Sequence, residues 1–182
     1  MGSISPSLDP ELLQTILETY RPTRFIETGS GAGHTAALAA GYFRRVDTIE
    51  LYPDTYQRAY RRLRPFANVV LHLGNSPNVL AQMLPDLREP ALFWLDAHWA
   101  CGPRLAPECP LLEELRAING TRGRHVILID DARLFTDAPP APHDPGQWPT
   151  LDEIQRLVTA WQDGSRLAVQ DDVIRILPQN DE

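Results

Sequence analysis

The stretch "FIETGSGAGHT", residues 25–35, contains three glycines at alternate positions, Gly29, Gly31 and Gly33. An apolar segment with an acidic end, Glu27, precedes them, and an alanine-rich segment follows. Glycine adopts backbone conformations with positive φ at little cost and has no side chain, so this cluster predicts a tight turn that a ligand approaches closely. We therefore expect a strand, a glycine turn and a helix, in that order.

Strand-like and helix-like segments alternate outward from this turn. Several of the expected strands are apolar throughout, which is typical of a parallel sheet covered by helices on both faces. The last two segments read as a hairpin around Asp171 and Asp172, so we predict one α/β domain over residues 1–182 with a C-terminal antiparallel hairpin. The expected strands and the hairpin lie at 24–29, 45–52, 68–76, 91–98, 124–132 and 166–178, and the expected helices at 10–20, 34–43, 54–63, 76–87, 109–118 and 150–162.

The composition excludes several classes of protein. The net charge of -7 argues against binding to nucleic acid, although Arg58, Arg61, Arg62 and Arg64 form one local basic cluster that is either a solvated helix face or an anion site. The chain has no lysine, so P-loop and Schiff-base enzymes are excluded. No apolar run is long enough for a membrane span and the N-terminus lacks a secretory pattern, so we expect a cytoplasmic protein without a membrane partner.

An acidic residue, Glu50, ends the second expected strand, 21 residues after Gly29. An acid at this place can accept hydrogen bonds from the ribose hydroxyls of a nucleotide bound at the turn. Dinucleotide enzymes use the pattern G-x-G-x-x-G, but here His34 stands at the third glycine position and Gly33 comes one residue early. The order of Glu27 and the three glycines resembles instead motif I of the class I S-adenosylmethionine-dependent methyltransferases.

This resemblance extends over roughly residues 22–178 and implies a Rossmann-like domain with a mostly parallel seven-stranded sheet. It also implies that Glu50 holds the ribose of S-adenosylmethionine and that Asn75 and Ser76 flank its adenine, although many members have an aspartate where Asn75 stands. Ser76 is also the expected N-cap of the helix at 76–87. The resemblance therefore implies these cofactor-binding residues: Glu27, Gly29, Gly31, Gly33, Glu50, Asn75, Ser76 and Asp96.

Polar side chains also end the fourth and fifth expected strands. Asp96 and His98 follow the fourth strand, and Asp130 and Asp131 follow the fifth. If these parallel strands are neighbours, about 4.8 Å apart, their carboxylates emerge side by side. A divalent cation with oxygen ligands is one way to compensate such a cluster, so Mg²⁺ or a similar ion is a candidate cofactor.

This cluster resembles that of the cation-dependent O-methyltransferases related to catechol methyltransferase. The resemblance implies Asp96, Asp130 and Asp131 as metal ligands. Those enzymes commonly place a lysine near the substrate hydroxyl, which this chain lacks. His98 shares a face with Asp96 in an extended segment, and histidine transfers protons near neutral pH, so His98 and Asp96 are the candidate catalytic residues. The alternative is that Asp96 orients the substrate or caps a helix and that His98 is an ordinary loop residue.

Three further features leave alternatives open. Asp96, His98, Cys101 and Cys109 can be read as a zinc site, and the two cysteines as a disulfide or as two ordinary thiols. The aromatic residues Trp99, Phe135 and Trp148 either line a substrate pocket or pack in the core. The proline-rich segment 136–149 is long enough for a lid or another functional loop.

Together these patterns predict methyl transfer from S-adenosylmethionine to a small-molecule acceptor, at a hydroxyl group and with possible help from a divalent cation. The acceptor pocket has to come from the N-terminal segment, the loop around Trp99 and the proline-rich segment, or from the second subunit of a homodimer. Two other classes stay open, namely a Rossmann enzyme that uses NAD and a regulatory protein that binds the cofactor without catalysis.

Overall fold

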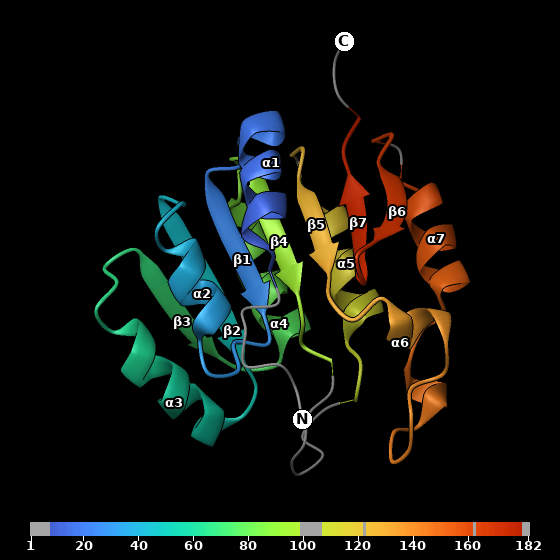
Figure 1. Cartoon of the computed structure of the whole chain (residues 1–182), viewed down its shortest axis with the longest axis horizontal. Helices are drawn as coiled ribbons and strands as arrows, with labels where there is room; N and C mark the ends of the chain where they lie inside the picture. The colour runs from blue at the N-terminus through green and yellow to red at the C-terminus, as the bar shows by residue number, and fades with distance from the viewer. Residues whose placement is uncertain (1–7, 99–106, 122, 162, 180–182) are drawn as a thin grey trace.

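The sheet has seven strands in the order β3-β2-β1-β4-β5-β7-β6, with helices on both faces (Figure 1). The computed structural model describes residues 8–98, 107–121, 123–161 and 163–179. The first five strands are parallel, and β7 runs antiparallel to both β5 and β6. The predicted α/β fold, its seven-stranded sheet and its C-terminal hairpin are therefore confirmed. The strands are β1 (Arg24–Thr28), β2 (Arg45–Glu50), β3 (Val69–Leu73), β4 (Ala91–Leu95), β5 (Val126–Ile129), β6 (Arg166–Gln170) and β7 (Val173–Leu177).

The helices divide between the two faces of the sheet. Side chains from α1 (Pro10–Tyr20), α2 (His34–Ala39) and α3 (Pro53–Leu63) pack in one apolar cluster on the first face. The cluster on the second face takes its side chains from α4 (Ser76–Met83), α5 (Leu111–Asn119), α6 (Arg133–Thr136) and α7 (Leu151–Thr159). Neighbouring residues of a strand enter opposite clusters, as Trp94 and Phe93 of β4 do, and this explains the apolar strands. Two 3-10 turns, η1 (Leu84–Asp86) and η2 (Pro145–Gln147), complete the elements.

Two helices of the fold begin with different kinds of cap. The carboxylate of Asp9 accepts a hydrogen bond from the amide of Glu11 at 3.1 Å, so it caps α1 at a helix that begins with a proline. The N-cap of α4 is Asn75 and not Ser76, which is the first helical residue. The predicted cap was therefore wrong by one residue, because asparagine is as favourable an N-cap as serine and Pro77 is tolerated in the first turn of the helix.

A buried ion network lies toward the amino ends of the first strands. Asp47 has a fully buried side chain and accepts hydrogen bonds from Arg24 at 2.9 Å, Arg45 at 2.8 Å and His72 at 2.9 Å. Burial alone raises the pKa of Asp47, but the bonds from His72, Arg45 and Arg24 outweigh it and hold that pKa well below its usual range. This charged group is therefore structural.

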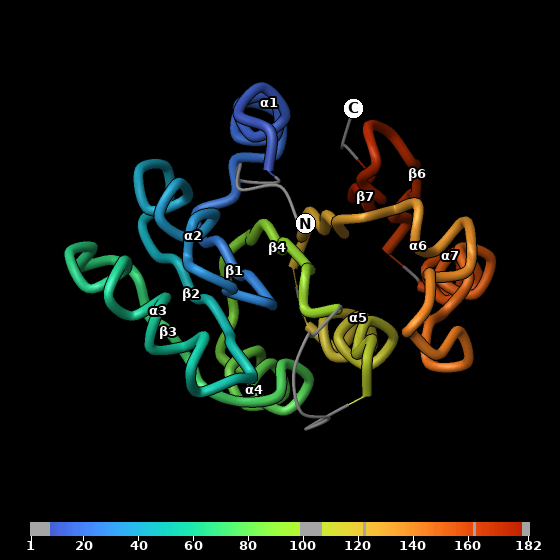
Figure 2. Tube along the Cα trace, turned by 60° about the horizontal axis from the view of Figure 1, so that its bottom comes forward, coloured from blue at the N-terminus to red at the C-terminus, as the bar shows by residue number. Residues whose placement is uncertain are grey.

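The order of the strands reverses between β1 and β4, which pair side by side at the centre of the sheet. In open parallel sheets, ligands bind beyond the carboxyl ends of the strands at such a reversal. The edge formed by the ends of β1, β2, β4 and β5, here named the carboxyl edge, is thus where a site is expected (Figures 1 and 2). None of the helices within the described ranges has the length and apolar character to cross a bilayer.

Candidate active site

The glycine turn leaves β1 at the carboxyl edge and enters α2. All three glycines have positive φ, at 83° for Gly29, 52° for Gly31 and 79° for Gly33. A Cβ atom on Gly29 would lie 2.1 Å from the backbone oxygen of Asp96, whereas a Cβ on Gly31 would meet no described atom within 4 Å. Gly29 is therefore required by close packing against the segment after β4, and Gly31 faces open space where a ligand can approach the backbone.

These two glycines give a matched pair of variants. Gly31→Ala is expected to cost about 1 kcal/mol of unfolding free energy, because only the left-handed backbone conformation opposes it. Gly29→Ala is expected to cost about 1–3 kcal/mol more, because the added methyl group overlaps the Asp96 carbonyl and the packed backbone has to shift. Urea titrations of both variants check this, and equal midpoints would show that Gly29 is not held against Asp96.

Glu50 ties the glycine turn to the end of β2. Its Oε2 atom accepts a hydrogen bond from the Gly31 amide at 3.0 Å, and its Oε1 atom accepts one from the Tyr52 amide at 2.9 Å. Burial raises the pKa of this carboxyl group, and the backbone hydrogen bonds from Tyr52 and Gly31 oppose that rise. Each carboxylate oxygen has further capacity as an acceptor, so Glu50 can both hold the turn and bind hydroxyl groups of a ligand.

Glu27 lies beneath the same turn and is 2% exposed. It accepts a hydrogen bond from the Thr48 hydroxyl, which itself lies 2.5 Å from the Ser30 hydroxyl. Burial raises the pKa of Glu27 to about 8, more than the hydrogen bond from Thr48 lowers it. The side chain is therefore mostly protonated at neutral pH, and a nearby positive charge would favour its ionised form.

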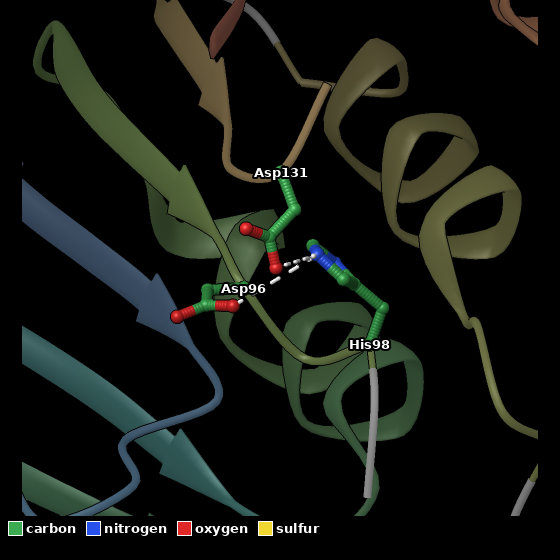
Figure 3. A group of neighbouring side chains, drawn as sticks. All are labelled: Asp96, His98 and Asp131. Atoms are coloured by element: carbon green, nitrogen blue, oxygen red, sulfur yellow. Dashed lines mark ion pairs between the residues drawn. The ribbon is translucent and has the colours of Figure 1, made fainter. Parts of the chain in front are cut away.

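Three side chains from the ends of β4 and β5 converge beside the turn (Figure 3). The Nε2 atom of His98 lies 3.9 Å from Oδ1 of Asp96 and 3.5 Å from Oδ2 of Asp131. The imidazole is 2% exposed, whereas the carboxylates of Asp96 and Asp131 are 32% and 27% exposed. Nε2 is buried and makes no hydrogen bond of standard geometry within the described residues. We name these three residues the Asp–His–Asp group.

The two carboxyl groups of the Asp–His–Asp group differ in electrostatics. Burial, followed by the charges of Asp130 and Asp131, raises the pKa of Asp96 well above its usual value. The imidazole of His98 holds the pKa of Asp131 below its usual value, and Arg133 adds to this effect with its Nη2 atom 2.8 Å from Oδ1 of Asp131. Two acids whose pKa values are driven apart can take different roles, one as a neutral and one as a charged group.

The other predicted residues lie around this group. Oδ1 of Asp130 accepts a hydrogen bond from the Asp131 amide at 2.9 Å, and Asp130 is not one of the three residues that offer ligand atoms within 4.8 Å of one another. Asn75 and Ser76 follow β3, which runs parallel to β2 and ends on the same side of the sheet, and Ser76 is buried. Of the two cysteines, Cys109 is a buried free thiol, and burial raises its pKa to about 12. Cys101 and Trp99 lie outside the described residues.

Sequence reasoning missed Glu114 of α5, which is 1% exposed. Its side chain lies against Ser76 and Thr28, and burial raises its pKa. Its charge is also close enough to raise the pKa of Asp96. A signal was present, because Glu114 follows Leu111 by three residues and precedes Ile118 by four, which places it on the buried face of the helix.

An aromatic wall covers the imidazole of His98. The rings of Phe135 and Trp148 lie 5.4 and 5.5 Å from it, centre to centre and edge-on, and 5.8 Å from each other. Phe135 and Trp148, predicted to line a pocket or pack in the core, are buried here and contact the Asp–His–Asp group.

The carboxylate of Glu108 anchors the proline-rich segment beside this wall. Its Oε2 atom accepts hydrogen bonds from the Trp148 indole at 3.1 Å and from the Asp144 amide at 3.0 Å, and lies 3.3 Å from Nδ1 of His143. The amide of Glu108 also donates to the side chain of Gln147 at 3.1 Å. Sequence reasoning gave Glu108 no role, because residues so far apart in the chain carry no shared pattern.

Comparisons with known proteins bear on the fold. No family model matches the chain, and no curated protein matches it. Among solved structures, a Podospora anserina methyltransferase bound to S-adenosylhomocysteine superposes with a TM-score of 0.68 at 19% identity, over 96% of this chain and 81% of that one. A candidate O-methyltransferase from Klebsiella pneumoniae gives 0.65 at 14% identity, over 98% and 84%. An rRNA methylase from Streptococcus thermophilus gives 0.57 at 15% identity, over 98% and 100%. The chain therefore has the fold of the class I S-adenosylmethionine-dependent methyltransferases.

Proposed function

We propose that this protein transfers the methyl group of S-adenosylmethionine to a hydroxyl group of a small molecule. One observation carries the proposal: Gly29 of the glycine turn packs directly against the backbone of Asp96, the first member of the Asp–His–Asp group. A cofactor held by the turn would thus lie next to side chains that can bind and deprotonate an acceptor. Proximity of this kind is the main requirement of an in-line displacement.

The residues at the turn fit this cofactor. Gly31 leaves open space beside its backbone, and Glu50 offers carboxylate oxygens to the ribose hydroxyls. The cofactor carries positive charge, which suits the neighbouring acids Glu27 and Asp96. When bound, it would supply an electrophilic methyl group.

The Asp–His–Asp group provides the acceptor chemistry. Asp96 is its most exposed member and is suited to orient the acceptor hydroxyl, while His98 is suited to take the proton. Asp131, itself held by Arg133, lies 3.5 Å from Nε2 and is suited to orient the imidazole. Phe135 and Trp148 fix the ring from the other side and keep water from it.

A second role for the same group is a divalent-cation site. The observation in its favour is that the buried Nε2 atom of His98 makes no standard hydrogen bond among the described residues and is directed at two carboxylates, with all three ligand atoms within 4.8 Å of one another. Two carboxylates and an imidazole suit Mg²⁺, Mn²⁺ or Zn²⁺. Such an ion would polarise the acceptor hydroxyl.

We further propose a small-molecule acceptor and not a nucleic acid. The acceptor side of the carboxyl edge carries Asp96, Asp130 and Asp131, which repel phosphate groups. The basic cluster lies on α3 instead, where Arg62 donates a hydrogen bond at 2.8 Å to the backbone oxygen of Ala32 in the glycine turn. A cytoplasmic location and a homodimer remain predictions.

The cofactor site is tested by calorimetry with S-adenosylhomocysteine. Glu50→Ala is expected to weaken binding by about 1.5–3 kcal/mol, because hydrogen bonds to a charged group are lost and the Gly31 amide loses its anchor. Glu18→Ala, an exposed glutamate of α1, is the matched control. Unchanged affinity in a folded Glu50→Ala protein, or binding of NAD in its place, would contradict the proposal. Mass spectrometry of methylated products separates an enzyme from a regulatory protein that only binds the cofactor.

A further inference from the structure

A cavity of about 430 Å³ lies between the end of α6 and the start of α7. Its apolar lining comes from Phe135, Trp148, Leu151 and three prolines, Pro139, Pro145 and Pro149. This volume lies within the range of small-molecule pockets, and an aromatic ring with a short side chain fits in it. We name this cavity the α6–α7 pocket.

The α6–α7 pocket shares a wall with the proposed methyl-transfer site. Phe135 and Trp148 line the pocket and also contact the ring of His98, at 5.4 and 5.5 Å between ring centres. Glu108 fixes the Trp148 indole through a hydrogen bond of 3.1 Å. A molecule that occupies the pocket therefore lies against the same rings that hold the candidate base.

The charged side chains that line this pocket are both acidic. Asp137 and Asp152 line it, both side chains are exposed, and neither carboxylate forms an ion pair within the described ranges. Arg156 donates to the backbone oxygen of Asp152 and does not line the pocket. Arg133, the nearest cation on α6, is committed to Asp131 and Asp172.

A second cavity of about 250 Å³, which Trp148 also lines, differs in its charged residues. That cavity is lined by Arg116 together with Glu113 and Glu153, so its charges include both signs. In the α6–α7 pocket two carboxylates and two aromatic rings line one cavity, a combination that suits an organic cation through charge and cation–π attraction.

We infer that the α6–α7 pocket binds a small organic cation, a molecule with an apolar or aromatic body and a protonated amine. This binding site goes beyond the proposed function and does not depend on it. The pocket itself selects cations over neutral and anionic molecules of the same shape.

The test uses three ligands of similar shape, measured by NMR on the full chain without cofactor. The Trp148 indole signal, assigned with Trp148→Phe, reports on the pocket. Tyramine, a cation, is expected to shift this signal and to bind at least about tenfold more tightly than 4-ethylphenol, which is neutral. The anionic 3-(4-hydroxyphenyl)propionate is expected to bind most weakly.

Variants test whether the two carboxylates of the pocket, and not the overall negative charge of the protein, attract tyramine. Asp152→Asn, and Asp137→Asn in a second protein, should each weaken tyramine binding several-fold and leave 4-ethylphenol binding unchanged. Asp86→Asn, an exposed aspartate of η1, should change neither. Equal binding of the three ligands, or tyramine affinity that neither pocket variant alters, would overturn the inference. Loss of S-adenosylhomocysteine binding in the calorimetric test would overturn the proposed function instead, because these titrations contain no cofactor.

Discussion

Replacement of His98 by alanine is expected to lower turnover by about 10²–10⁴-fold, the usual contribution of a general base. The affinity for S-adenosylhomocysteine should hardly change, because the imidazole lies with Asp96 and Asp131 on the acceptor side and not at the glycine turn. The acidic limb of the pH–rate profile should also disappear. Steady-state kinetics between pH 5 and pH 9 check both effects. Turnover and a pH profile equal to those of the unmodified protein would show that His98 is not the base.

Chelation then distinguishes the two roles proposed for the Asp–His–Asp group. If the group holds a cation, activity is lost in EDTA and restored by Mg²⁺ or Mn²⁺, and Asp96→Ala abolishes that restoration. If His98 acts as a base alone, EDTA leaves turnover unchanged while His98→Ala still lowers it. The ion pair between Arg133 and Asp131 at 2.8 Å favours the second result, because it offsets part of the negative charge that would attract a cation.

The second large effect concerns stability and pH. Burial raises the pKa of Glu27 to about 8 in the folded protein, from an ordinary value of 4.5. Between these values the folded state keeps a proton that the unfolded state releases, so this stabilisation is complete below about pH 4.5 and is lost as the pH rises through 8. At about 1.4 kcal/mol per unit, the loss amounts to roughly 3–5 kcal/mol.

Glu27→Gln should remove this loss of unfolding free energy at high pH. The amide stays neutral and its oxygen can still accept the hydrogen bond from Thr48, so the variant should match the unmodified protein at pH 5 and exceed its unfolding free energy above pH 8. Urea titrations at both pH values measure the difference. Glu18→Gln on the exposed face of α1 is the control. Parallel stability curves for Glu27→Gln and the unmodified protein would mean that Glu27 is already ionised in the folded state.

Much of the site follows from the sequence because a parallel sheet brings the carboxyl ends of its strands to one edge. The glycine turn, Glu50 and the convergence of Asp96, His98 and Asp131 all depend on that rule and on the strand assignments alone. The sequence did not indicate which of the two neighbouring acids, Asp130 or Asp131, lies beside Asp96 and His98. Asp131 has a positive φ of 54°, and such a departure from the strand redirects its side chain in a way that no alternation pattern indicates.

Other members of the site depend on contacts that sequence patterns do not encode. Glu114 needs the rotation of α5 against the sheet, which packing decides. Glu108 and Trp148 are 40 residues apart, and their hydrogen bond forms only after the proline-rich segment has folded back. The Asp47 network likewise required the register of three strands, because Arg24, Asp47 and His72 come from β1, β2 and β3.

The anchoring of the proline-rich segment by Glu108 has a consequence for protein engineering. The turn that would hold the cofactor is built from β1, β2 and the start of α2, whereas the Asp144 amide and the Trp148 indole in residues 137–149 donate hydrogen bonds to one oxygen of Glu108. A library that varies the loop between Thr136 and Trp148, with Glu108 and Trp148 kept, would leave the donor half intact. With the proposed methyl transfer, such a scaffold would offer directed evolution a way to change the acceptor without rebuilding the cofactor site.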